Sequence, residues 1–166
     1  MAIKSNRTSR DYFNTFGASG KDAVNPAPSN LSWSVFFDAA ASKSWIKAAD
    51  NAAYAQGTGD FSVECWMKAQ QYSHYMNFIN TREAAGTAAG WTFSTESDAK
   101  LGFYSSGHQY TTAGLVVDNV WTHLVTTRQS GTLRLFQDGV LRSNAANSQN
   151  YTNQLFCIGI NCSGPG

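Results

Sequence analysis

Hydrophobic and polar residues alternate along several short segments of the chain, which is the pattern of β-strands that bury one face. Segment 61–68 is the clearest example, because its two faces have different compositions. One face carries Phe61, Val63, Cys65 and Met67, and the other carries Ser62, Glu64, Trp66 and Lys68. Segment 31–37 alternates in the same way. We therefore predict a half-buried strand in each segment.

Segment 120–142 predicts three further strands joined by two tight turns. Ser130-Gly131 and Asp138-Gly139 each separate runs of β-branched, aromatic and leucine residues. Asp-Gly is a strong hairpin signal because both residues tolerate a positive φ angle. In the middle run, Leu133 and Leu135 share one face.

More short strands are expected at 45–47, 75–80, 91–97, 100–104, 108–112, 115–117 and 154–160. Gly, Ser and Asn separate many of these segments, and the chain has no long segment of helical period. This pattern predicts an all-β, two-sheet antiparallel sandwich. Its core is expected to contain Phe61, Val63, Cys65, Trp91, Leu133 and Leu135.

Two motifs resemble the laminin G-like branch of the concanavalin A-like jelly rolls. The first is Trp121-Thr122-His123-Leu124 leading to Thr127-Arg128, a Gly turn, and Thr132-Leu133-Arg134-Leu135-Phe136 before Asp138-Gly139. The second is Gly59-Asp60-Phe61-Ser62-Val63-Glu64, closed by Trp66. Phe36-Phe37-Asp38 resembles the family's opening strand, although Ala39 stands where the family has Gly. The resemblance covers roughly 31–160 and implies a two-sheet jelly roll.

The predicted organisation is an irregular N-terminal arm, 1–30, followed by one jelly-roll domain, 31–166. The resemblance implies a closing strand after Ile158-Gly159-Ile160, and the sequence given does not contain it. An open sheet edge is then expected near 33–37, where unpaired backbone groups invite pairing. Three explanations stay open: the arm covers the edge, a neighbouring subunit covers it, or the protein continues.

Composition excludes several partners. The 166 residues include 42% hydrophobic and only 14% charged residues, with a formal net charge of +1. A chain with so little basic charge is not expected to bind nucleic acid. No run approaches the roughly 18 apolar residues of a membrane span, and the polar start predicts cytoplasmic synthesis without a signal peptide. Of the three cysteines, Cys65 is expected to be buried, whereas Cys157 and Cys162 could pair but are expected to be reduced.

Catalysis and metal binding have little basis in the sequence. Glycosidases need two facing carboxylates, and Glu64 is the only acid in its strand, so we expect it to have a structural role and to contact a neighbour on the sheet face or in a loop. The family resemblance implies calcium as a usual cofactor. However, Asp98 and Asp118 are isolated and Asp138 is needed by its turn, so we expect no required metal or other cofactor.

Aromatic residues are the remaining candidates for a binding surface. Trp66 and Trp91 are expected in the core, while five side chains near strand ends are candidates for ligand contact. These five are Tyr72, Tyr75, Tyr104, His108 and Tyr110.

Two functions are consistent with these features. The first is a non-catalytic structural or adhesion module, a virion (phage-like) decoration, fibre or tail component. It would lie on the virion surface, act outside cells, and bind neighbouring subunits as a homo-oligomer, with glycans as further ligands. The alternative is a carbohydrate-binding, lectin-like module of a cell-surface or secreted protein. The sequence identifies neither the ligand nor the source.

Overall fold

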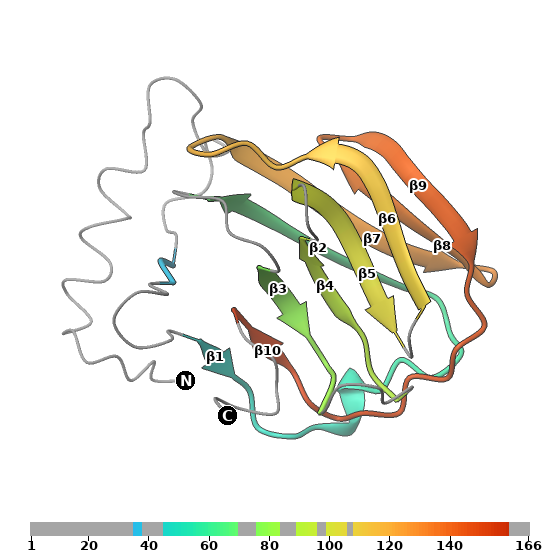
Figure 1. Cartoon of the computed structure of the whole chain (residues 1–166). Helices are drawn as coiled ribbons and strands as arrows, with labels where there is room; N and C mark the ends of the chain where they lie inside the picture. Colours follow the sequence, from blue (N-terminus) through green and yellow to red (C-terminus); the bar gives the residue numbers. More distant parts are fainter. Residues whose placement is uncertain are drawn as a thin grey trace, which may run out of the picture.

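A computed structural model describes residues 35–37, 45–69, 76–83, 89–95, 99–105 and 108–159, with only the backbone described for 108–115. These residues form two antiparallel sheets, which Figure 1 shows as stacked layers. The predicted two-sheet sandwich is therefore confirmed. Within the described ranges, no helix has the length and apolar character needed to cross a membrane.

The larger sheet has six strands in the order β1-β10-β3-β4-β5-β6. The strands are β1 (Ile46–Lys47), β10 (Cys157–Ile158), β3 (Asn77–Asn80), β4 (Thr92–Thr95), β5 (Lys100–Ser105) and β6 (His108–Leu115). A 3-10 turn, η1 (Ala52–Tyr54), follows β1, and the Asn51 side chain caps it by accepting from the Ala53 N–H.

The smaller sheet has four strands in the order β2-β7-β8-β9. They are β2 (Phe61–Lys68), β7 (Trp121–Gln129), β8 (Thr132–Gln137) and β9 (Val140–Ala146). Both predicted turns are present, and Ser130, Gly131, Asp138 and Gly139 all have positive φ angles. This is the backbone twist that matches a tight hairpin, so the turn residues fix the register of β7, β8 and β9.

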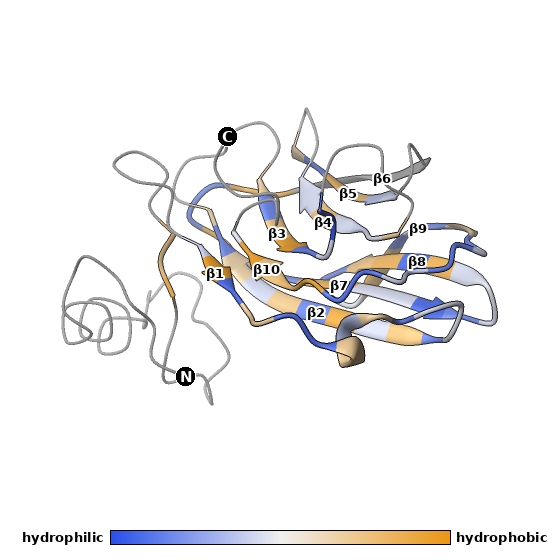
Figure 2. Ribbon diagram, turned by 90° about the horizontal axis from the view of Figure 1, so that it is seen from below, coloured by the Kyte–Doolittle hydropathy of each residue, from blue (hydrophilic) through white to orange (hydrophobic). Residues whose placement is uncertain are grey.

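The core lies between the sheets and contains most of the side chains predicted for it. Leu133 and Leu135 are 1% exposed and Trp91 is fully buried, while Phe61, Val63 and Cys65 are partly buried against them. These side chains face the core because hydrophobic and hydrophilic residues alternate along the strands, as the bands of colour in Figure 2 show. Trp66 was expected in this core, and that expectation is wrong: it lies on the opposite face of β2 with 40% of its surface exposed.

Several predicted strand limits need correction. Residues 35–37 lie in no strand, and 31–34 fall outside the described residues together with the predicted arm. One strand, β6, covers 108–115 in place of the two short strands expected at 108–112 and 115–117, and Val116 and Val117 lie outside it. Its register with β5 shifts between Lys100 and Gly102. Strand β10 includes only two residues of the segment 154–160.

The cysteines follow the predictions only in part. Cys65 is a free thiol, and burial, with a smaller contribution from Glu64, raises its pKa to about 12. It therefore packs as a small uncharged group, as expected. The expectation of a reduced thiol at Cys157 is wrong, because that residue is disulfide-bonded. Cys162 lies outside the described residues.

Candidate functional site

Three of the five candidate ligand residues lie on neighbouring strands of the six-stranded sheet. Tyr104 is near the end of β5, and His108 and Tyr110 are at the start of β6. The backbone of Tyr104 pairs with Gln109, which lies between those two residues. The other two candidates, Tyr72 and Tyr75, lie outside the described residues, so the structure does not test them.

Tyr104 is joined by Arg82, a residue that the sequence did not single out. The Arg82 guanidinium carbon lies 4.2 Å from the centre of the half-buried Tyr104 ring. Burial lowers the pKa of Arg82, whereas the Tyr104 side chain acts to raise it. Guanidinium groups remain charged in proteins, so a cation and an aromatic ring stand together here.

The segment after β3 holds Arg82 in place. Thr81 donates its N–H to the Trp91 carbonyl at 2.9 Å, and the Thr81 hydroxyl accepts from the Trp91 N–H at 3.0 Å. The Asn153 side-chain amide donates to the Thr81 carbonyl at 2.9 Å. Arg82 therefore follows a residue that is tied to both the next strand and a distant loop.

Strand β4 adds a free hydroxyl group next to Tyr104. Backbone register aligns Asn80, Thr92 and Tyr104 in one row across β3, β4 and β5. Thr92 is only 4% exposed, and its hydroxyl oxygen has no hydrogen-bond partner. Because buried polar atoms are normally paired, this hydroxyl is a group that could still accept or donate a hydrogen bond. We call Arg82, Thr92 and Tyr104 the Tyr104 site.

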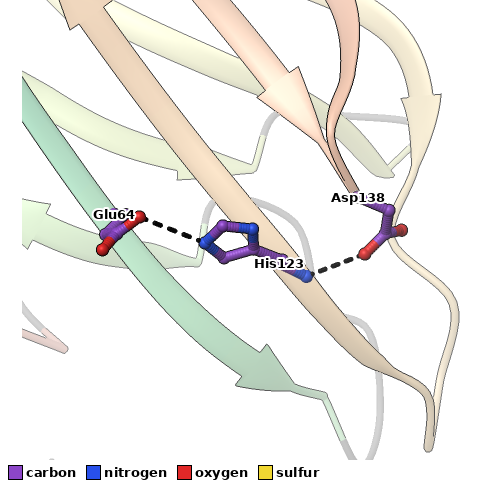
Figure 3. Close-up of polar contacts among 3 residues, drawn as sticks. All are labelled: Glu64, His123 and Asp138. Carbon is purple, nitrogen blue, oxygen red and sulfur yellow. Dashed lines mark hydrogen bonds and ion pairs between the residues drawn. The ribbon is translucent and has the colours of Figure 1, made fainter. Parts of the chain in front are cut away.

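A different polar cluster lies on the outer face of the four-stranded sheet (Figure 3). His123 Nε2 lies 3.3 Å from Glu64 Oε2, and the imidazole stacks on Trp66 with ring centres 4.8 Å apart and an interplanar angle of 17°. The His123 N–H donates to Asp138 Oδ1 at 2.9 Å. Of the two neighbours that were expected for Glu64, on the sheet face or in a loop, the structure shows the one on the sheet face.

The outer-face cluster contains two carboxylates, Glu64 and Asp138, and both contact His123. On its own strand, Glu64 has Ser62 and Trp66 as neighbours on the same face, so a second carboxylate is missing there. Among the residues that the structure describes, no three His, Cys, Asp or Glu side chains gather in a set that could hold a metal ion. Of the acids considered for calcium, Asp118 and Asp138 are described, whereas Asp98 lies outside the described residues.

Asp138 provides a test of how the hairpin is held. Its carboxylate accepts from His123, and its φ angle of 51° is one that Asn adopts readily and Ala does not. We expect Asp138→Ala to lower the free energy of unfolding by about 1–2 kcal/mol, and Asp138→Asn to be nearly neutral. Urea unfolding of both variants measures the difference. Equal losses would show that neither the conformation nor the hydrogen bond matters.

The sequence matches the family model described as the concanavalin A-like lectin/glucanases superfamily over residues 23–164. The match covers most of the chain, so this protein belongs to that superfamily. The laminin G-like resemblance is thus confirmed. No curated protein matches the sequence significantly.

Solved structures with the same fold are distant in sequence. A Bacteroides ovatus protein whose proposed role is carbohydrate binding has a TM-score of 0.56 at 12% identity, over 69% of this chain and 34% of its own. Mouse laminin alpha1 chain domains LG4-5 have a TM-score of 0.54 at 14% identity, and the match covers 69% of this chain and 31% of theirs. Domain 4 of AbnA, a GH43 extracellular arabinanase from Geobacillus stearothermophilus, was solved with arabinotriose. It has a TM-score of 0.53 at 21% identity, and the match covers 72% of this chain and 59% of that domain's chain.

This chain spans between 31% and 59% of the length of those three structures. At such low identities the similarity shows the shared fold alone. These comparisons give no support to a virion component, whereas two of the three structures are named for carbohydrate binding or contain a bound sugar.

Proposed function

We propose that this domain is a carbohydrate-binding, lectin-like module without catalytic activity, which acts at a cell surface or outside the cell. The glycan binds at the Tyr104 site on the six-stranded sheet. The observation that carries the proposal is the Arg82 guanidinium over the Tyr104 ring at 4.2 Å, beside the unpartnered hydroxyl of Thr92.

The chemistry of the Tyr104 site suits a sugar. Sugar rings present hydroxyl groups and an apolar face, and they are recognised by a few fixed polar groups beside aromatic side chains. Arg82 supplies hydrogen-bond donors, while the hydroxyl groups of Tyr104 and Thr92 can donate or accept. The backbone register pairs Tyr104 with Gln109, whereas His108 and Tyr110 pair with Ser105 and Phe103, so these two candidates are not part of the proposed site.

The non-catalytic part of the proposal rests on the missing acid. Glycoside hydrolysis needs a second carboxylate at a fixed separation from the first. Arg82, Thr92 and Tyr104 carry no carboxylate, Glu83 after Arg82 is a single acid, and Glu64 is on the other sheet. Binding without turnover is what these groups can perform.

A glycan array tests the proposal directly. We expect the wild-type chain to bind a defined set of glycans, and Tyr104→Ala and Arg82→Ala each to weaken that binding by about tenfold or more. Tyr104→Phe should lose less, because it keeps the ring. Titration calorimetry with the best glycan then gives the dissociation constants.

The matched control is Arg134→Ala, which removes an arginine from the other sheet. It should leave glycan affinity unchanged. Binding that is absent in the wild type, or that falls equally in all the alanine variants, would contradict the proposed site.

A further inference from the structure

The backbone that carries Arg82 is held at both polar groups of one peptide unit. The carbonyl of Thr81 accepts a hydrogen bond from the Asn153 side-chain amide at 2.9 Å. The N–H of Arg82, in the same peptide unit, donates to the Asn80 side-chain oxygen. A peptide unit is planar, so holding its two polar groups sets its orientation. That orientation in turn sets the direction in which the Arg82 side chain leaves the backbone.

The two side chains that hold this peptide unit differ in their distance along the chain. Asn80 is the last residue of β3, only two residues before Arg82. Asn153 belongs to the segment after β9, 72 residues from Thr81. The contact of Asn153 therefore exists only in the assembled sandwich, and it makes the position of Arg82 depend on the segment that returns from β9.

The backbone around Asn153 is itself fixed. The N–H of Asn153 donates to the Ala89 carbonyl at 2.9 Å. Two residues earlier, Tyr151 exchanges two backbone hydrogen bonds with Gly57, at 2.8 and 2.9 Å. The amide of Asn153 thus reaches Thr81 from a backbone that other contacts already hold.

Glycine at position 90 gives the Asn153 amide access to Thr81. A side chain at Gly90 would place its first carbon 2.8 Å from the Asn153 amide nitrogen, and closer still to the Thr81 carbonyl oxygen. Heavy atoms in favourable contact are about 3.5–4.0 Å apart, so a side chain here would displace one of the two partners. The backbone at Gly90 therefore lies directly against this hydrogen bond.

The held peptide unit is connected to the Tyr104 site through a single side chain. The Arg82 guanidinium carbon is 4.2 Å from the centre of the Tyr104 ring, and Arg82 Nε is buried. Because the arginine side chain is long, a small rotation of its backbone would move the guanidinium much further than the backbone itself. Holding the backbone in advance also lowers the entropic cost of ligand binding.

We propose that Asn153 is a positioning residue of the Tyr104 site. Through the Thr81 carbonyl it sets the direction of Arg82 and keeps the guanidinium over the Tyr104 ring. Asn153 acts through Arg82 and not by contact with the sugar. Its effect on glycan affinity rests on the proposed function, whereas its effect on Arg82 does not.

Nuclear magnetic resonance of the glycan-free chain tests the positioning itself. In the wild type, the Tyr104 ring should shift the Arg82 Nε–H proton upfield, and Tyr104→Leu should remove that shift. Asn153→Ala should also remove most of it, because the arginine side chain then leaves the ring. An unchanged shift in Asn153→Ala, or a wild type without the shift, would overturn the proposal whether or not the chain binds a glycan.

Glycan affinity tests the route through Arg82. With the best-binding glycan of the array, Asn153→Ala should raise the dissociation constant by about fivefold or more. In a chain that already carries Arg82→Ala, the same change should add less than about twofold, because the residue through which Asn153 acts is absent. Equal losses in both backgrounds would overturn the proposal. A wild type that binds no glycan would contradict the proposed function, and the resonance measurement then decides the positioning.

The matched control is Asn147→Ala, which removes another asparagine from the segment after β9. Asn147 Oδ1 accepts from Arg128 at 3.2 Å, and the Asn147 amide donates to the Tyr151 hydroxyl at 2.8 Å. This variant should lose stability in urea but keep the Arg82 shift and the glycan affinity. If it behaves like Asn153→Ala, the effects come from general destabilisation and the proposal fails.

A wild-type measurement covers the case in which Asn153→Ala does not fold by circular dichroism. The side-chain amide protons of Asn153 should exchange slowly with solvent, because the amide is partly buried and donates to Thr81. Exchange as fast as that of the exposed Asn144 side chain would overturn the proposal. Asn153→Gln, which keeps an amide donor, then replaces the alanine variant and should retain part of the Arg82 shift. Complete retention of the shift would also overturn the proposal.

Discussion

Replacing Arg128 by methionine is expected to lower the free energy of unfolding by about 3–5 kcal/mol. Arg128 is only 1% exposed, although its guanidinium is charged and charged side chains usually lie at the surface. It donates to the carbonyls of Gly57, Gly59 and Gln149 at 2.6–2.8 Å and to Asn147 Oδ1 at 3.2 Å. Methionine would fill much of the space and leave those buried oxygens without a donor.

The surroundings of Arg128 explain why this loss should be large. The rings of Phe61 and Tyr151 lie 5.0 and 4.8 Å from the guanidinium carbon, so the cation is enclosed on its flat faces. Burial lowers the pKa of Arg128, while Tyr151 and Asp60 act to raise it. One side chain therefore ties the segment before β2 to the segment after β9.

Urea unfolding of Arg128→Met, Arg128→Lys and Arg134→Ala provides the measurement and its controls. Lysine keeps the charge but lacks the planar guanidinium that donates to several oxygens at once, so we expect Arg128→Lys to lose an intermediate amount of stability. Arg134→Ala, on the outer face of β8 opposite Thr127, should change stability by less than about 0.5 kcal/mol. A methionine variant as stable as the wild type would show that the oxygens find other donors.

Truncation of Leu135 to alanine should cost about 2–5 kcal/mol, because it leaves a cavity between the sheets. Leu135 is 1% exposed and belongs to the same buried cluster as Leu124, Phe93 and Phe103. Facing side chains from two sheets relax only partly into such a space, so the cost exceeds that of transferring the deleted carbons to water.

The control for Leu135→Ala is Val117→Ala, which deletes apolar carbons from a side chain that is 54% exposed. It should be nearly neutral. Urea unfolding at one protein concentration compares the two variants. Similar losses would mean that the inward face of β8 has been misassigned.

The sequence by itself determined the strands that have strong alternation and the turns that join them. The strand at 61–68 was predicted with its observed limits, and the three strands and two turns predicted in 120–142 are present, although β9 continues to Ala146. Side-chain alternation has a period of two, and Asp138-Gly139 permits positive φ angles. The same alternation placed Trp66 on the face opposite Phe61. Its size and hydrophobicity nevertheless suggested burial, and alternation proved the better guide.

Only the tertiary structure decided which residues from distant segments meet. Arg82 reaches Tyr104 because β3 and β5 flank β4 in the six-stranded sheet, and no local pattern encodes that order. Likewise, the local sequence shows Arg128 only as a charged residue at an inward position of β7, where the pattern would predict an apolar one. Its oxygen partners come from Gly57 to Gly59 and from Asn147 to Gln149, which strand pairing alone brings to the same place. Contacts of this kind depend on sheet order and register, which a periodic sequence pattern leaves open.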